Sequence, residues 1–195
     1  MRTNNKKMCI RVFSLMIFLI MTSNVIQAQK FNLVNNESSL KVFGTSNIHD
    51  WHIDAEEQSG TLTFKNVATG AIEKCNIAVV VESLKSGKSS MDKNTYKALN
   101  ADSYTTISFQ LTEVKKVTSK GDGKFDISSQ GDLTISGVKK SVPLDFTVVI
   151  AGDKTILTGE KKIVMTEYNI EPPKALFGTI TTGDEVTIKF STQFK

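Results

Sequence analysis

Alternation of apolar and polar residues with a period of two constrains this chain most, because successive side chains of a β-strand point to opposite faces of a sheet. The segment 106–112 shows the pattern clearly. Its apolar residues Ile107, Phe109 and Leu111 share one face, and polar residues occupy the other. Residues 142–150 repeat it with five apolar residues in phase. Both segments are predicted to be strands that bury one face.

Five further segments follow the same rule and are rich in β-branched or aromatic residues. They are Leu40–Thr45, Gly60–Phe64, Cys75–Val81, Phe125–Ile135 and Val186–Phe190. Short glycine-containing turns separate many of the segments and favour antiparallel neighbours. The pattern predicts an all-β domain of seven or eight strands. A sandwich and a closed barrel both bury such strands, and long, evenly spaced strands favour the barrel.

One stretch departs from the strand period. Met91, Thr95 and Leu99 recur at helical spacing, and Ser89 or Ser90 stands where a helix N-cap is expected. A short helix is therefore predicted between residues 89 and 100. The segment 171–174 contains two consecutive prolines and is expected to be a loop or a sheet edge.

The first 28 residues have the composition and order of a cleavable secretory signal. Its basic residues are Arg2, Lys6, Lys7 and Arg11. The apolar run 12–21 that follows is too short to span a bilayer, which needs about 20 residues. Cleavage is expected after Ala28, which would leave residues 29–195 as one domain without a transmembrane anchor, in the periplasm or outside the cell. A retained anchor is the alternative.

Charge and cysteine content exclude two classes of protein. The chain has 24 basic and 20 acidic residues, and four basic residues lie in the signal, so the rest of the chain carries 20 of each. Such a domain lacks the positive surface that nucleic acids require. Cys75 alone remains after cleavage, so no intramolecular disulfide can form. Because Cys75 is in phase with Ile77 and Val79, a buried, inert thiol is expected.

A catalytic or metal site would have to use His49, Asp50 and His52. Residues three apart on a strand face opposite ways, so the two imidazoles could share a metal only across a turn. We favour a turn at the mouth of a barrel, with Trp51 plugging its end or lining its interior. No nucleophile motif, phosphate-binding glycine loop or carboxylate pair stands out elsewhere. No catalytic residue, metal or cofactor is predicted.

Four ordered segments resemble the YceI-like family. They are Gly44–Trp51, Gly60–Phe64, Tyr96–Phe109 and Gly131–Lys140, of which Gly-Asp-Leu-Thr-Ile-Ser-Gly-Val at 131–138 is the most specific. The resemblance covers essentially all of residues 29–195. It implies an extended eight-stranded antiparallel β-barrel of lipocalin-like shape with one short helix. It also implies export, and an apolar interior that holds a long polyisoprenoid such as a quinone tail or a prenyl phosphate.

Ligand contacts are expected from the apolar interior that the resemblance implies. The expected residues are Trp51, Phe64, Ile77, Val79, Met91, Leu99, Phe109, Leu133, Phe146 and Phe190. The segment 91–97 lacks the arginines and histidine found in the better-known branch of the family. Lys93 and Lys97 could contact a head group as point charges, and a neutral head group or a plain fatty chain agrees equally well with this segment.

The sequence thus favours an exported, non-enzymatic protein that sequesters or carries a long-chain apolar lipid, such as a polyisoprenoid or an isoprenoid quinone. Two alternatives stay open: a structural or stress-related envelope domain with a filled core, and a metal-dependent enzyme built on His49, Asp50 and His52. A cavity inside the barrel would separate the first alternative from lipid binding. The oligomeric state, a homodimer included, is left open.

Overall fold

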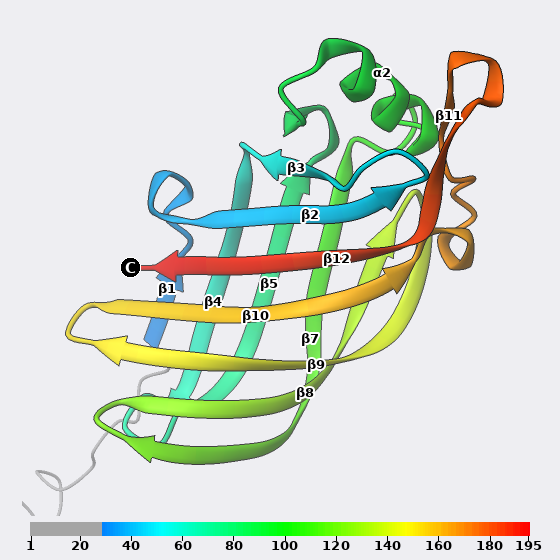
Figure 1. Cartoon of the computed structure of the whole chain (residues 1–195). Helices are drawn as coiled ribbons and strands as arrows, with labels where there is room; N and C mark the ends of the chain where they lie inside the picture. Colours follow the sequence, from blue (N-terminus) through cyan, green and yellow to red (C-terminus); the bar gives the residue numbers. More distant parts are fainter. Residues whose placement is uncertain (1–28) are drawn as a thin grey trace, which may run out of the picture.

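In residues 29–195, one curled antiparallel β-sheet makes up most of the fold, and a single α-helix, α2, lies across one of its ends (Figure 1). The computed structural model describes residues 29–195, so the predicted export signal lies outside the described residues. The strand order in the sheet is β1-β4-β5-β7-β8-β9-β10-β12-β2-β3-β6, and β11 pairs with β12. The predicted all-β class with one short helix is confirmed.

The strands fall into a long and a short group. The long strands are β2 (Ser39–Ser46), β4 (Gln58–Asn66), β5 (Ala71–Val80), β7 (Thr106–Gly121), β8 (Lys124–Ile135), β9 (Val138–Ala151), β10 (Lys154–Val164) and β12 (Ile180–Phe194). The short strands are β1 (Gln29–Asn32), β3 (Trp51–Ala55), β6 (Leu84–Lys85) and β11 (Lys174–Ala175). The helix is α2 (Ser89–Ala98), and 3-10 turns occur at η1 (Asn35–Glu37), η2 (Val81–Ser83), η3 (Met165–Tyr168) and η4 (Leu176–Gly178).

The strand count differs from the predicted eight. Residues 29–195 form a 12-stranded sheet, in which eight strands are at least eight residues long. The additional four are pairings of two to five residues. Such short pairings carry too few residues for an alternation to be recognised in the sequence.

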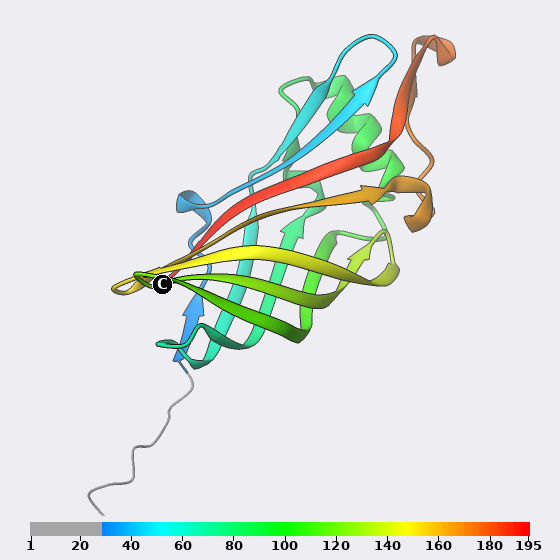
Figure 2. The same ribbon diagram turned by 60° about the horizontal axis from the view of Figure 1, so that its bottom comes forward.

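Contacts at two places help to close the curled sheet. The chain that follows β1 lies against the end of β12, where Leu33 bridges Phe194 and the amide of Asn32 donates to the carbonyl of Lys195 at 2.7 Å. Elsewhere β3 pairs with β6, just before α2. The result is a barrel-like shell rather than a sandwich (Figure 2).

Two strands show why the alternation is incomplete in the sequence. β10 is not predicted, because Gly159 and Lys161 interrupt the inward-facing series of apolar residues. β7 continues to Gly121, well past its predicted part, and its pairing with β8 shifts register between Leu111 and Glu113 and again between Val114 and Lys116. Each shift changes the phase, so a fixed period of two no longer fits.

The helix lies where it is predicted, but its N-cap is different. Lys88 occupies the N-cap position and its side chain makes no capping hydrogen bond, so neither Ser89 nor Ser90 has that role. Instead Asp92 Oδ1 accepts hydrogen bonds from the amide of Ser86 at 2.8 Å and from its hydroxyl at 2.5 Å. An acceptor inside the first turn therefore holds the chain that enters α2.

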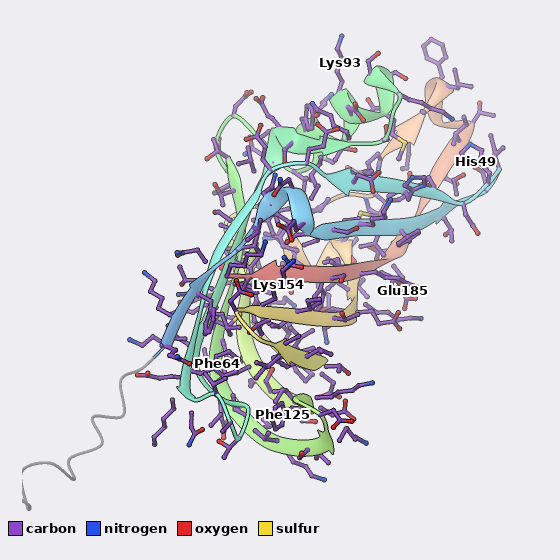
Figure 3. All side chains as sticks on the ribbon, turned by 90° about the vertical axis from the view of Figure 1, so that its left-hand side faces the viewer. His49, Phe64, Lys93, Phe125, Lys154 and Glu185 are labelled. Atoms are coloured by element: carbon purple, nitrogen blue, oxygen red, sulfur yellow. The ribbon has the colours of Figure 1, made fainter. Side chains whose placement is uncertain are left out.

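Buried apolar side chains fill the end of the barrel far from α2, and we call them the floor cluster. Its members are Leu62, Phe64, Ile72, Cys75, Phe125, Ile127, Phe146, Val148, Leu157 and Phe194. Figure 3 shows Phe64 and Phe125 at this end and Lys93 at the other. Smaller clusters lie beneath η3 and beneath α2. The core therefore forms one large cluster at the end far from α2 and two smaller clusters at the other end.

Candidate functional site

An internal cavity of about 370 Å³ lies between the floor cluster and α2. Its walls are the inward faces of the strands, for example Ile77 and Val79 of β5 and Leu133 and Ile135 of β8. Met91 and neighbouring residues of α2 cover it from above. Its volume falls in the range of small-molecule sites, roughly 300 to 1,000 Å³. The lining is mainly aliphatic and aromatic, as expected where period-two strands turn their apolar faces inward.

The structure brings nine of the ten apolar residues singled out in the sequence around this cavity. The nine are Trp51, Ile77, Val79, Met91, Leu99, Phe109, Leu133, Phe146 and Phe190. Phe64 does not line the cavity but lies in the floor cluster, where it is 1% exposed. Lys93 and Lys97 do not line the cavity either, and both are exposed on α2; Figure 3 shows Lys93 on the helix. Ligand contact by these residues stays a prediction.

Aromatic rings on the cavity wall lie against glycines of neighbouring strands. A Cβ atom on Gly44 would stand 2.1 Å from Cζ2 of Trp51, which shows that the indole covers the glycine. The indole N–H also donates to the carbonyl of Thr45 at 2.9 Å. The same arrangement joins Phe109 to Gly131 and Phe190 to Gly159, where a Cβ would lie 2.3 Å and 2.7 Å from the ring. Because these rings lie on glycines, they take up less of the interior.

Sequence reasoning missed Lys161, which lines the cavity from β10. The residue is half-buried and in phase with Leu157 and Ile163, both of which are buried and line the cavity. The signal that could have revealed it is a lysine on the apolar face of an alternating segment. The signal was not recognised because Lys161 itself interrupts the apolar series from which β10 would have been predicted.

The two histidines are not brought together. His49 lines the cavity mouth, in the turn between β2 and β3, and its Nδ1 lies 2.8 Å from the backbone oxygen of Asp50. His52 is exposed on β3, with its ring 6.0 Å from that of Phe43. Among residues 29–195 no group of three His, Cys, Asp or Glu side chains could hold a metal ion. The turn and the inward-facing Trp51 correspond to the favoured interpretation of this segment.

Cys75 lies on β5 and reaches the lower part of the cavity, where it is 2% exposed. Burial raises the pKa of its thiol to about 12, from an ordinary value of 9.0, because the thiolate would lose its hydration. The neutral thiol is therefore the form that the fold favours.

We expect the thiol to stabilise the fold fully below about pH 9, and this contribution to fall as pH rises from 9 towards 12, since the unfolded chain ionises first. The stability advantage of the wild type over Cys75→Ala should accordingly shrink between about pH 9 and pH 11. Denaturant unfolding of both proteins measures it. The effect of lysine and tyrosine titration on stability is common to both proteins, so it cancels when their free energies of unfolding are subtracted. An advantage that stays constant over this range would contradict the burial of Cys75.

Fold and cavity together define the class: an antiparallel β-barrel with a mainly apolar internal cavity covered by one helix. The chain belongs to the YceI-like family, because the YceI-like domain model matches residues 31–194. The resemblance drawn from the four sequence segments is thus confirmed. Within residues 29–195, no helix combines the length and apolar character needed to cross a membrane.

Relatives of known sequence support this membership. Protein YceI of Escherichia coli is 32% identical over 120 residues, which cover 57% of this chain and 59% of the relative. A UPF0312 protein of Vibrio parahaemolyticus is 35% identical over 122 residues, which cover 57% of this chain and 60% of the relative. The matched stretch thus spans about three fifths of the length of these relatives.

Solved structures share the fold at low identity. BcnA of Burkholderia cenocepacia superposes with a TM-score of 0.69 at 20% identity, covering 83% of this chain and 98% of BcnA. A polyisoprenoid binding domain from Saccharophagus degradans superposes with a TM-score of 0.65 at 12% identity, covering 85% of this chain and 97% of that domain. Identities this low support the common fold only.

Proposed function

We propose that this protein binds a long-chain apolar lipid, such as an isoprenoid or a hydrocarbon chain, inside its barrel and keeps it out of water. The observation that carries the proposal is the cavity of about 370 Å³, lined mainly by apolar side chains. No chemical step is required, because removal of the chain from water is itself favourable. The open volume argues against the alternative of a domain with a filled core.

The energy available is adequate for binding. Each methylene removed from water contributes about 0.8 kcal/mol, so a dozen would contribute roughly 10 kcal/mol before the cost of ordering the chain is subtracted. The S. degradans domain with the same fold is a polyisoprenoid binding domain, and this agrees with a chain-like ligand. The basic and apolar segment 1–28 supports a role outside the cytoplasm, in the periplasm or beyond.

Filling the cavity from α2 is the direct test. Ala98 is half-buried and lines the cavity, whereas its neighbour Lys97 is exposed on the helix. We expect Ala98→Trp to weaken binding of a long-chain polyprenol at least tenfold, because the indole occupies the space that the chain needs. Lys97→Trp is the matched control, since it places the same side chain on the outside of the same helix. Native mass spectrometry and fluorescence titration measure the binding.

Three results would contradict the proposal. The first is equal binding by the Ala98 and Lys97 variants, which would place the lipid outside the barrel. The second is a wild-type protein that refuses polyprenols, isoprenoid quinones and long-chain fatty acids alike. The third is that protein purified from its own cell envelope releases no lipid on extraction with organic solvent.

A further inference from the structure

Lys161 stands out among the charged residues of β10 because it faces the interior. Its two neighbours face outwards and are paired: Glu160 lies 3.6 Å from Lys189, and Lys162 lies 2.9 Å from Glu185. Lys161 lies between them, so its side chain points to the opposite face, where it lines the cavity. Its partner across the strands on β12 is Ile188, which also lines the cavity.

The cavity carries cationic groups and no carboxylate. Besides the thiol of Cys75, its ionisable lining residues among residues 29–195 are His49, Lys88, Lys161 and Lys174. Lys88 and Lys174 are exposed, and Lys174 lies 3.7 Å from Glu171. Within residues 29–195 Lys161 makes neither a salt bridge nor a side-chain hydrogen bond. The half-buried cation of the cavity wall is thus left without an internal anion.

The position of Lys161 along the barrel fits a ligand head group. Gly159 lies two residues closer to the floor along β10 and is covered by the ring of Phe190. The buried Ile163 lies two residues closer to the mouth. The pairing of β10 with β9 ends at Gly159 and Phe146, so the wall beside Lys161 is held by β12 alone. The neighbours of Lys161 along and across the strands, Gly159, Ile163 and Ile188, carry no charge.

We propose that the barrel selects a single-chain amphiphile with a carboxylate head, a long-chain fatty acid, whose carboxylate pairs with Lys161 while its chain fills the apolar cavity. This inference rests on the proposed function and specifies its ligand class. One ammonium group balances one negative charge. A diphosphate head would bring further charges into surroundings that offer no second half-buried cation, and unpaired charge in an apolar site is costly.

The competing explanation of Lys161 is structural. A lysine has a long aliphatic stem, and its ammonium group could extend to water where β9 and β10 separate. In that case the cavity has no preference for an anion. The two explanations differ in the affinity ratio between a charged and a neutral ligand of the same chain length.

The test compares hexadecanoic acid with hexadecanol at about pH 8, where a carboxylic acid is ionised and lysine is protonated. The proteins are the wild type, Lys161→Met and, as matched control, Lys162→Met on the outer face. We expect the wild type and the control to prefer the acid about tenfold or more. Lys161→Met should reduce that ratio to about one while it still binds the alcohol, since methionine keeps the apolar lining.

Two outcomes would overturn the inference: equal affinity of the wild type for acid and alcohol, or an unchanged preference in Lys161→Met. Neither outcome affects the proposed function, whereas a wild type that binds neither compound nor a polyprenol would contradict both proposals. Unfolding of the empty proteins adds a second readout. Lys161→Met should be at least as stable as the wild type, because it removes an unpaired cation from an apolar wall. A structural lysine would instead leave its variant less stable.

Discussion

Phe64→Ala is expected to lower the free energy of unfolding by about 3–5 kcal/mol, the usual cost of deleting a fully buried phenyl ring. Phe64 is 1% exposed within the floor cluster. Its ring meets that of Phe31 edge to face, with centroids 5.9 Å apart and planes at 88°. Close packing on all sides leaves the site little freedom to collapse, so most of the lost volume would remain as a void. Denaturant unfolding measures the change.

Phe190→Ala is the matched control, because Phe190 is half-buried and one side of its ring faces the existing cavity. Its loss should cost about half as much, or less, since fewer contacts are broken. Phe64→Ala should retain lipid binding in whatever fraction stays folded, whereas Phe190→Ala alters the cavity wall. Equal destabilisation by the two variants would show that the floor and the wall do not differ in packing as described.

Gly44→Ala is expected to destabilise the protein by about 1–3 kcal/mol, although it adds only one methyl group. Gly44 does not have a positive φ, so the backbone tolerates alanine and the effect is steric. The new Cβ would lie 2.1 Å from Cζ2 of Trp51, which forces the indole away from its place and from its hydrogen bond to Thr45. The displaced ring has the cavity as its nearest free space. Lipid affinity should therefore fall together with stability.

A double-mutant cycle identifies the cause. Trp51→Leu removes the ring, so Gly44→Ala should cost much less in that background than in the wild type. We expect a coupling of about 1 kcal/mol or more between the two sites, as for residues in direct contact. Additive effects would mean that Gly44 matters for its backbone and not for the indole above it.

The wall and the floor of the barrel are packed differently. Three rings of the cavity wall, those of Trp51, Phe109 and Phe190, lie on glycines, whereas buried side chains such as Phe64 fill the floor. The same strands thus provide a stable closed end and an open interior. Phe64 contributes to the floor and does not line the cavity, whereas Ala98 lines the cavity, so variants at these two positions can separate stability from ligand capacity.

The sequence by itself determined the fold class and most strands, because period-two alternation and turn glycines are local consequences of backbone geometry. It determined α2 from residues four apart, and the family from four ordered segments. It could not show β10, since Gly159 and Lys161 interrupt the apolar phase, or the full length of β7, since bulges shift the phase.

Only the tertiary structure decided which inward-facing residues fill the core and which surround the cavity. Phe64 and Phe109 have the same character in the sequence, yet one lies in the floor cluster and the other on the cavity wall. Alternation tells the face of a strand but not the height along the barrel, which depends on the register between strands distant in sequence. The same register places Lys161 on the cavity wall, where no anionic side chain of residues 29–195 pairs with it. Burial and pairing of a charge are relations between strands, and a single strand's sequence does not contain them.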